Sequence, residues 1–160
     1  MRYVGIWYNF SFLSVAKKLS ILALSYTITP LNADHDHKTG CVIYIIEKDG
    51  KCVLHANDTG YFPEDTWQYL KENIQHIHFA TFDCTEPGSY RNHNTVGWHM
   101  NYPTVKNVKH RLMEMGLIDN QSICVINHFS HNGQYIYDEL CTLVKNDGFF
   151  VSYDGREFEF

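Results

Sequence analysis

An alternation of strand-like and helix-like segments begins near Ser25 and constrains the fold more than any other feature of this sequence. Asp49-Gly50 separates two apolar runs, which predicts a β-hairpin because glycine accepts the positive φ of such a turn. Pro63 and Pro103 each precede apolar residues at helical spacing, so a helix is expected after each. The expected strands are 26–32, 41–46, 52–55, 77–82, 122–127 and 149–153, and the expected helices begin at Pro63, at Pro103 (ending at Gly116) and at Ile136. Strands that alternate with helices predict an α/β fold.

The first 24 residues differ from this regular part. They are apolar and aromatic, but Lys17-Lys18 interrupts them, so no run reaches the ~18 apolar residues of a membrane helix. A secretory signal would place its charges before the apolar core rather than inside it. We therefore expect a single domain over 1–160 in which residues 1–24 are an atypical apolar segment at the edge of the core. A peripheral membrane segment or a signal segment is the alternative.

Charge and cysteine content restrict the partners and the compartment. The 160 residues include 13 Lys and Arg against 18 Asp and Glu, so the net charge is −5. An acidic chain lacks the broad positive surface that duplex DNA requires. The 5 cysteines are odd in number and form no C-x-x-C pair, which predicts free thiols and a cytoplasmic protein. The 10 histidines favour a metal site, because imidazole is a common ligand of transition metals.

Four clusters of polar, ligand-type residues are expected where strands end. They are 33–37, 57–60, 98–100 and 127–131. In α/β proteins, residues directly after buried strands are typical of active sites, because the sheet fixes their positions.

Three segments at these positions resemble a known family. They are YTITPLNADH at 26–35, VLHANDTG at 53–60 and INHFSH at 126–131. In order and spacing they are similar to the C-terminal motifs of the metallo-β-lactamase-fold hydrolases. The closest likeness is to the phosphodiesterase branch, which includes a cyclic-phosphate phosphodiesterase and the tRNA 3′-processing endonucleases. The resemblance runs from about Ser25 to Phe160 and implies the C-terminal half of an αββα sandwich, with a mixed sheet of five or six strands and helices on its outer face.

The resemblance also implies roles for individual residues. His35 corresponds to a histidine metal ligand, Asp58 to the carboxylate that bridges two metals, and His128 to the last histidine ligand. His99 falls where the phosphodiesterase branch places a histidine that assists the leaving group. His131 is expected to orient a ligand or to contact a phosphate. In the family, hydroxide held by the metals attacks phosphorus. Imidazole and carboxylate ligands suit Zn²⁺ or Mn²⁺ and also iron.

The family's H-x-H-x-D-H motif is missing from this chain. His35-Asp36-His37 is followed by Lys38, and His76-Ile77-His78 by Phe79. That motif supplies most of the ligands of both metals, and the resemblance begins near the middle of the usual domain. We therefore expect the isolated chain to hydrolyse a small phosphodiester weakly or not at all.

The alternative function is a catalytically inactive remnant that acts as a binding or assembly module. Loss of the N-terminal sheet would leave an apolar face, which predicts self-association or pairing with a separate N-terminal half. Simpler interpretations also exist for the single residues. Asp58-Thr59-Gly60 is also consistent with an ordinary turn or with the D-T-G of a dimeric aspartic protease, although the helical patterns argue against that all-β fold. His35, His99 and His128 are also compatible with exposed or packed histidines.

Overall fold

The computed structural model describes residues 19–21, 25–36, 38–89, 99–131 and 133–160. The strands form one mixed sheet of seven strands in the order β1-β2-β3-β4-β5-β6-β7. The elements are β1 (Leu19–Ile21), β2 (Tyr26–Asn32), β3 (Val42–Lys48), β4 (Lys51–Ala56), α1 (Glu64–Asn73), β5 (Phe79–Asp83), α2 (Tyr102–Glu114), β6 (Ile123–Asn127), α3 (Tyr137–Val144) and β7 (Phe150–Val151). The expected α/β class is confirmed, although the sheet has more strands than the five or six expected.

The directions of the strands place the carboxyl ends of four of them along the same side of the sheet, which we call its carboxyl edge. Strands β1 to β4 pair antiparallel, and β4 to β7 pair parallel. Because β2 and β4 both run antiparallel to β3, the carboxyl ends of β2, β4, β5 and β6 lie at the same edge. The loops that follow these strands therefore meet there, as the sequence predicts.

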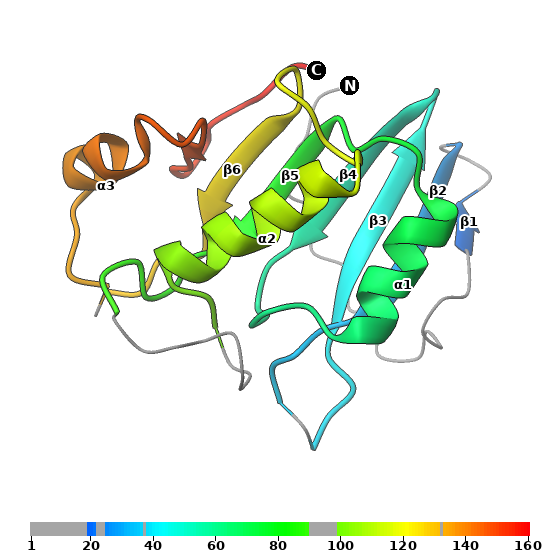
Figure 1. Ribbon diagram of the computed structural model, residues 1–160, viewed down its shortest axis with the longest axis horizontal. Coiled ribbons are helices and arrows are strands. Elements are labelled where there is room, and N and C mark those ends of the chain that lie inside the picture. The colour runs from blue at the N-terminus through cyan, green and yellow to red at the C-terminus, as the bar shows by residue number, and fades with distance from the viewer. Residues whose placement is uncertain (1–18, 22–24, 37, 90–98, 132) are drawn as a thin grey trace.

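Helices α1 and α2 cover one face of the sheet (Figure 1). Trp67 and Leu70 of α1 and Val108 and Leu112 of α2 are no more than 1% exposed in the core between the helices and the strands. Both helices are amphipathic, so burial of their apolar faces stabilises the layered arrangement. No helix in the described part of the chain is long and apolar enough to cross a membrane.

The turns follow their expected chemistry, with small shifts. Asp49 and Gly50 both have positive φ, at 50° and 75°, as a two-residue hairpin turn requires. Pro63 is the N-cap of α1 rather than its first residue. Gly116 (φ 71°) follows the C-cap Met115, and the amides of residues 116 and 117 donate back to the carbonyls of residues 113 and 112. This pattern is a Schellman motif.

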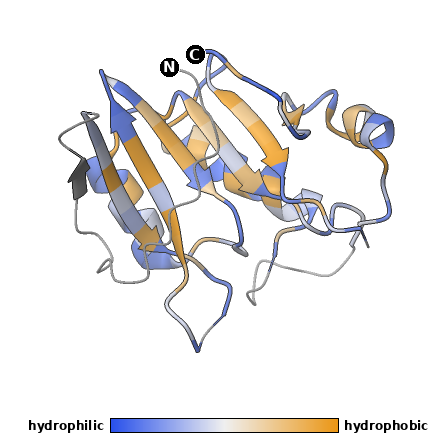
Figure 2. Ribbon diagram, turned by 180° about the vertical axis from the view of Figure 1, so that it is seen from behind, coloured by the Kyte–Doolittle hydropathy of each residue, from blue (hydrophilic) through white to orange (hydrophobic). Residues whose placement is uncertain are grey.

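The opposite face of the sheet has its own small apolar cluster. Val53, Phe79 and Val125 lie there, and the rings of Phe158 and Phe160 pack on Phe79. Figure 2 shows this face from behind, where none of the three helices covers the strands.

Of residues 1–24, the structure describes only the backbone of β1. The rest of the predicted apolar N-terminal segment lies outside the described residues. All five cysteines are free, as expected.

We expect Gly116→Ala to lower the free energy of unfolding by about 1 kcal/mol, because a residue with a side chain is strained at this positive φ. Gly40→Ala is the matched control, since a Cβ at Gly40 meets nothing within 4 Å and its φ is not in the left-handed region. Urea unfolding of both variants measures the difference. Equal stability of the two variants would contradict the Schellman assignment.

His55 of β4 makes stability depend on pH. Its Nδ1 lies 3.1 Å from Thr81 Oγ1, and burial, with a contribution from the nearby His128, lowers its pKa to about 4. The unfolded chain therefore binds a proton that the folded chain lacks between about pH 4 and pH 6.5. The free energy of unfolding contributed by this group is complete above pH 6.5 and decreases as the pH falls toward 4.

The free energy of unfolding of the wild type decreases as the pH falls from neutral to about 4. We expect His55→Gln to reduce that decrease by about 2–3 kcal/mol, because glutamine does not titrate. Urea unfolding at a series of pH values measures it. His110→Gln, at an exposed position of α2, is the control and keeps the wild-type pH dependence. Parallel pH profiles for His55→Gln and wild type would contradict the assignment.

Candidate functional site

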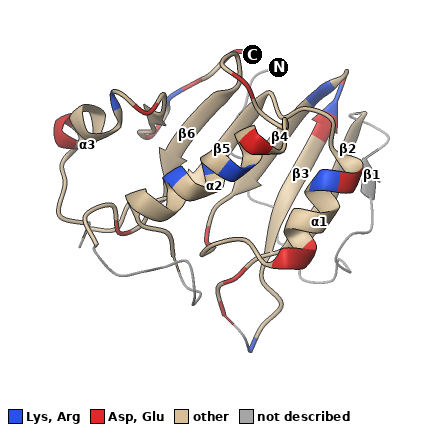
Figure 3. Ribbon diagram, viewed as in Figure 1, with Lys and Arg blue, Asp and Glu red and all other residues tan. Residues whose placement is uncertain are grey.

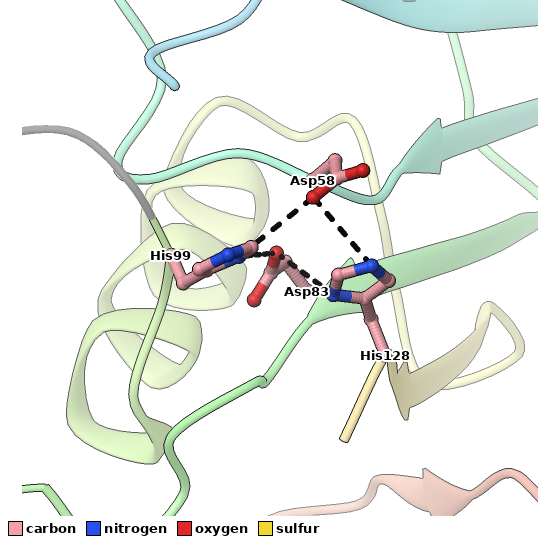
Figure 4. Close-up of side chains that lie close together, drawn as sticks. All are labelled: Asp58, Asp83, His99 and His128. Atoms are coloured by element: carbon pink, nitrogen blue, oxygen red, sulfur yellow. Dashed lines mark hydrogen bonds and ion pairs between the residues drawn. The ribbon is translucent and has the colours of Figure 1, made fainter. Parts of the chain in front are cut away.

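Asp58 lies at the centre of a group of histidines at the carboxyl edge of the sheet. Its Oδ1 is 3.5 Å from His128 Nε2, 3.7 Å from His35 Nε2 and 3.9 Å from His99 Nδ1. Figure 4 shows Asp58 facing His99 and His128. The sequence predicted all four of these residues as site residues, and the structure brings them together from loops that are far apart in the chain.

Each of these residues owes its position to a strand end or a helix start. His35 follows β2, Asp58 follows β4 and His128 follows β6 directly, whereas His99 lies just before α2. Asp58 and His128 have positive φ, at 54° and 61°, so the backbone turns sharply where each strand ends. Such backbone conformations cost energy and cluster at functional sites. In the D-T-G turn the positive φ therefore falls on Asp58, and not on the glycine that a simple turn would use.

The turn after Asp58 joins the loops around it. Thr59 is fully buried, and its Oγ1 accepts a hydrogen bond of 3.1 Å from the amide of Asp34. The amide of Gly60 donates to the carbonyl of Asp34 at 2.7 Å. These bonds fix the loop that carries His35 against the loop that carries Asp58.

Asp83, at the end of β5, is a site residue that the sequence analysis missed. It is fully buried, and both carboxylate oxygens are occupied by hydrogen bonds. Oδ1 accepts from the amide and hydroxyl of Thr85 and from the amide of Met100, and Oδ2 accepts from the amide of Thr59 and from His99 Nδ1. A carboxylate with this many partners is a fixed anchor rather than an open ligand.

A signal for Asp83 existed in the sequence. Asp83-Cys84-Thr85 follows an apolar strand in the same way as the clusters that were identified. Residues 90–98 lie outside the described part of the chain, so the expectation that residues 98–100 follow a strand stays a prediction. β5 ends at Asp83, and His99 lies in the segment that enters α2. Asp83 and His99 nevertheless meet, since the chain returns to this edge before α2 begins.

The pair of Asp83 and His99 has a defined protonation chemistry. His99 Nδ1 lies 2.7 Å from Asp83 Oδ2, and this hydrogen bond raises the pKa of His99 above its usual value, although partial burial opposes the shift. The charges of Asp83, Asp58 and Glu86 act in the same direction. His99 therefore carries a proton at higher pH than a free histidine.

The donor set fits a metal ion. One ligand atom each from Asp58, Asp83, His99 and His128 lies within 4.8 Å of the others. Ligands around a tetrahedral Zn²⁺ lie about 3.3–3.6 Å apart, given metal–ligand distances near 2.0–2.2 Å. The distances from Asp58 Oδ1 to His128 Nε2 (3.5 Å) and His35 Nε2 (3.7 Å) come close to that spacing. The oxygens of Asp83 already accept several hydrogen bonds, and His35 lies outside this cluster of four but close to Asp58, so the roles of His35, Asp58 and His128 as ligands stay a prediction.

The remaining candidates lie elsewhere. His131 is exposed in the turn after β6, and its orienting role stays a prediction. His78 Nδ1 accepts a hydrogen bond of 3.2 Å from the amide of Cys52, at the opposite end of β4 from Asp58. Cys84 is fully buried, and burial raises the pKa of its thiol, so it is poorly suited to act as a nucleophile.

The described loops at this edge of the sheet are acidic. Their charged residues are Asp34, Asp36, Asp58 and Glu86 against a single base, Lys38. Figure 3 shows acidic residues along these loops, whereas most of the basic residues in view lie on the helices and strands. An anionic substrate would be repelled here unless a cation were bound.

Comparison with known proteins identifies the fold. No protein-family model and no curated protein matches the sequence. Among solved structures, the metallo-β-lactamase fold protein YhfI from Bacillus subtilis is 17% identical, with a TM-score of 0.65 over 92% of this chain and 54% of that one. The metallo hydrolase Igni18 from Ignicoccus hospitalis is 22% identical, with a TM-score of 0.63 over 92% of this chain and 60% of that one. A diphosphatase from the PhnP family is 13% identical, with a TM-score of 0.60 over 92% of this chain and 47% of that one.

This chain thus spans about half the length of its structural neighbours. The α/β class and the mixed sheet agree with that match. The chain has the metallo-β-lactamase fold over the part of the domain that it contains.

Proposed function

We propose that this chain carries part of the active site of a metal-dependent hydrolase and that its substrate is a phosphodiester. The observation that carries the proposal is the convergence of His35, His99 and His128, from three separate segments, on one carboxylate oxygen of Asp58. The acidic loops around them favour a bound cation. The phosphodiester class is supported by the resemblance in sequence and by a structural neighbour described as a diphosphatase.

In this proposal His35, Asp58 and His128 hold the metal, which is Zn²⁺ or Mn²⁺, or alternatively iron. A divalent cation bound there would neutralise substrate charge and make water a stronger nucleophile at neutral pH. His99 lies next to the ligands, and Asp83 holds its Nδ1 proton. Its other ring nitrogen, Nε2, is then the atom that donates a proton to the departing oxygen. The raised pKa of His99 keeps more of this proton available at neutral pH.

We further propose that the isolated chain is a weak catalyst. One cluster of ligand-type side chains among the described residues could hold a metal ion, and the H-x-H-x-D-H motif of the resembling family is missing from the sequence. Stabilisation of charge in phosphoryl transfer depends on how many cations and donors surround the phosphorus. Five free cysteines fit a reducing compartment, and we therefore propose a cytoplasmic location.

For metal binding, we expect about one equivalent of Zn²⁺ or Mn²⁺ per chain after dialysis, because three ligand residues plus water complete one tetrahedral site. Asp58→Asn should lose it, since asparagine tolerates the same positive φ but lacks the charge. Elemental analysis of the purified protein measures the content. Asp154→Asn, in an exposed turn, is the matched control and keeps its metal. A folded wild-type protein without metal, or full metal content in Asp58→Asn, would contradict the proposed ligands.

For catalysis, we expect slow hydrolysis of bis(4-nitrophenyl) phosphate that depends on added Zn²⁺ or Mn²⁺. His99→Gln should lower kcat by about 10²-fold with little change in KM, because the proton donor acts in the transition state. Release of 4-nitrophenolate measures the rate, and His110→Gln serves as the control on an exposed helix face. Metal-loaded protein without turnover would contradict the proposed phosphodiesterase activity. An unchanged kcat in His99→Gln would contradict the role of His99 as proton donor.

The alternative function is an inactive binding or assembly module. No described helix covers the face with Val53, Phe79 and Val125, but these side chains are no more than 2% exposed, so a partner would have to displace Phe158 and Phe160 to reach them. Such a module would self-associate or pair with a separate N-terminal half. Absence of metal together with a stable dimer in analytical ultracentrifugation would support this function over hydrolysis.

A further inference from the structure

The hydroxyl of Thr85 touches three of the site residues at once. Its Oγ1 lies 2.9 Å from Asp83 Oδ1, 3.1 Å from His99 Nδ1 and 2.8 Å from His128 Nδ1. It also lies 2.9 Å from the carbonyl oxygen of His128. Thr85 follows β5 and is buried, so water does not compete strongly for these contacts.

One hydroxyl carries one proton, which limits how these contacts can be arranged. Asp83 Oδ1 and the carbonyl of His128 can only accept, so the Thr85 proton goes to one of them. The hydroxyl oxygen must then accept a proton from His128 Nδ1. The reverse arrangement, in which Thr85 donates to a bare His128 Nδ1, would leave the hydroxyl oxygen facing two acceptor oxygens, Asp83 Oδ1 and the His128 carbonyl, each at 2.9 Å and with no proton between them.

From this arrangement we infer that Thr85 is a positioning residue that fixes the tautomer of His128 with its proton on Nδ1. The lone pair of His128 then lies on Nε2, the atom that is 3.5 Å from Asp58 Oδ1. For the role of that lone pair as a metal ligand, the inference rests on the function proposed above. The tautomer itself follows from the hydrogen bonds of the chain alone.

The same contacts explain why a hydroxyl is needed at this position. A methyl group of similar size would leave His128 Nδ1 facing only the more distant Asp83 Oδ2. Groups that hydrogen-bond the far nitrogen of a histidine ligand set its tautomer and ring orientation, and their loss typically lowers metal affinity about 10- to 100-fold.

The test compares Thr85→Val, which removes the hydroxyl at nearly constant volume, with Thr85→Ser, which keeps it. Long-range ¹H–¹⁵N NMR of the metal-free protein reports which ring nitrogen of His128 carries the proton, with the signal assigned from His128→Gln. Chelator competition with Zn²⁺ reports affinity. Thr81→Val is the matched control, because this buried hydroxyl of β5 contacts His55 and Asn57 and not His128. Thr85→Ala replaces Thr85→Val if the valine variant does not fold.

We expect wild type, Thr85→Ser and Thr81→Val to show the Nδ1–H tautomer and similar zinc affinity. Thr85→Val should populate Nε2–H and bind Zn²⁺ about 10- to 100-fold more weakly. An Nε2–H tautomer in the wild type, an unchanged tautomer in Thr85→Val, or equal losses in the serine and valine variants would overturn the inference. If the wild type binds no zinc, the proposed function fails, whereas the NMR result still decides the role of Thr85.

Discussion

The buried carboxylate of Asp83 is the interaction on which the rest of the site depends. Its partners come from the turn after β4, from the residues after β5 and from the segment that enters α2. A buried charge is expensive unless it is fully hydrogen-bonded, so these segments must reach the same point for the fold to be stable. Placement of His99 is a consequence of that requirement.

Around Asp83 the site has a buried, hydrogen-bonded part and a solvent-exposed part. Thr59, Asp83 and Thr85 are buried and joined by hydrogen bonds, whereas the side chain of Asp58 is 57% exposed and faces three imidazoles. The positive φ values of Asp58 and His128 show that the backbone accepts unfavourable conformations at these two positions. A rigid support beneath exposed side chains of ligand type is consistent with a metal site.

Much of this could be predicted from the sequence because the signals are local. The Asp49-Gly50 hairpin, the helices after Pro63 and Pro103 and the strand-end positions of His35, Asp58 and His128 depend on turn chemistry and periodicity within a few residues. Asp83 was not among the predicted site residues. Its importance lies in partners as distant along the chain as Thr59 and Met100.

The sequence by itself determined the α/β class, the order of the elements and the kinds of residue that follow the strands, since these follow from local pattern and backbone preference. Only the tertiary structure decided that Asp83 holds His99, that Thr85 lies between Asp83 and His128, and that three imidazoles surround Asp58. The physical reason is that most of these contacts join residues distant in the chain: Asp83 and His99 are 16 positions apart, and Thr85 and His128 are 43 apart. Sheet register and the path into α2 bring them together, and no local pattern encodes either.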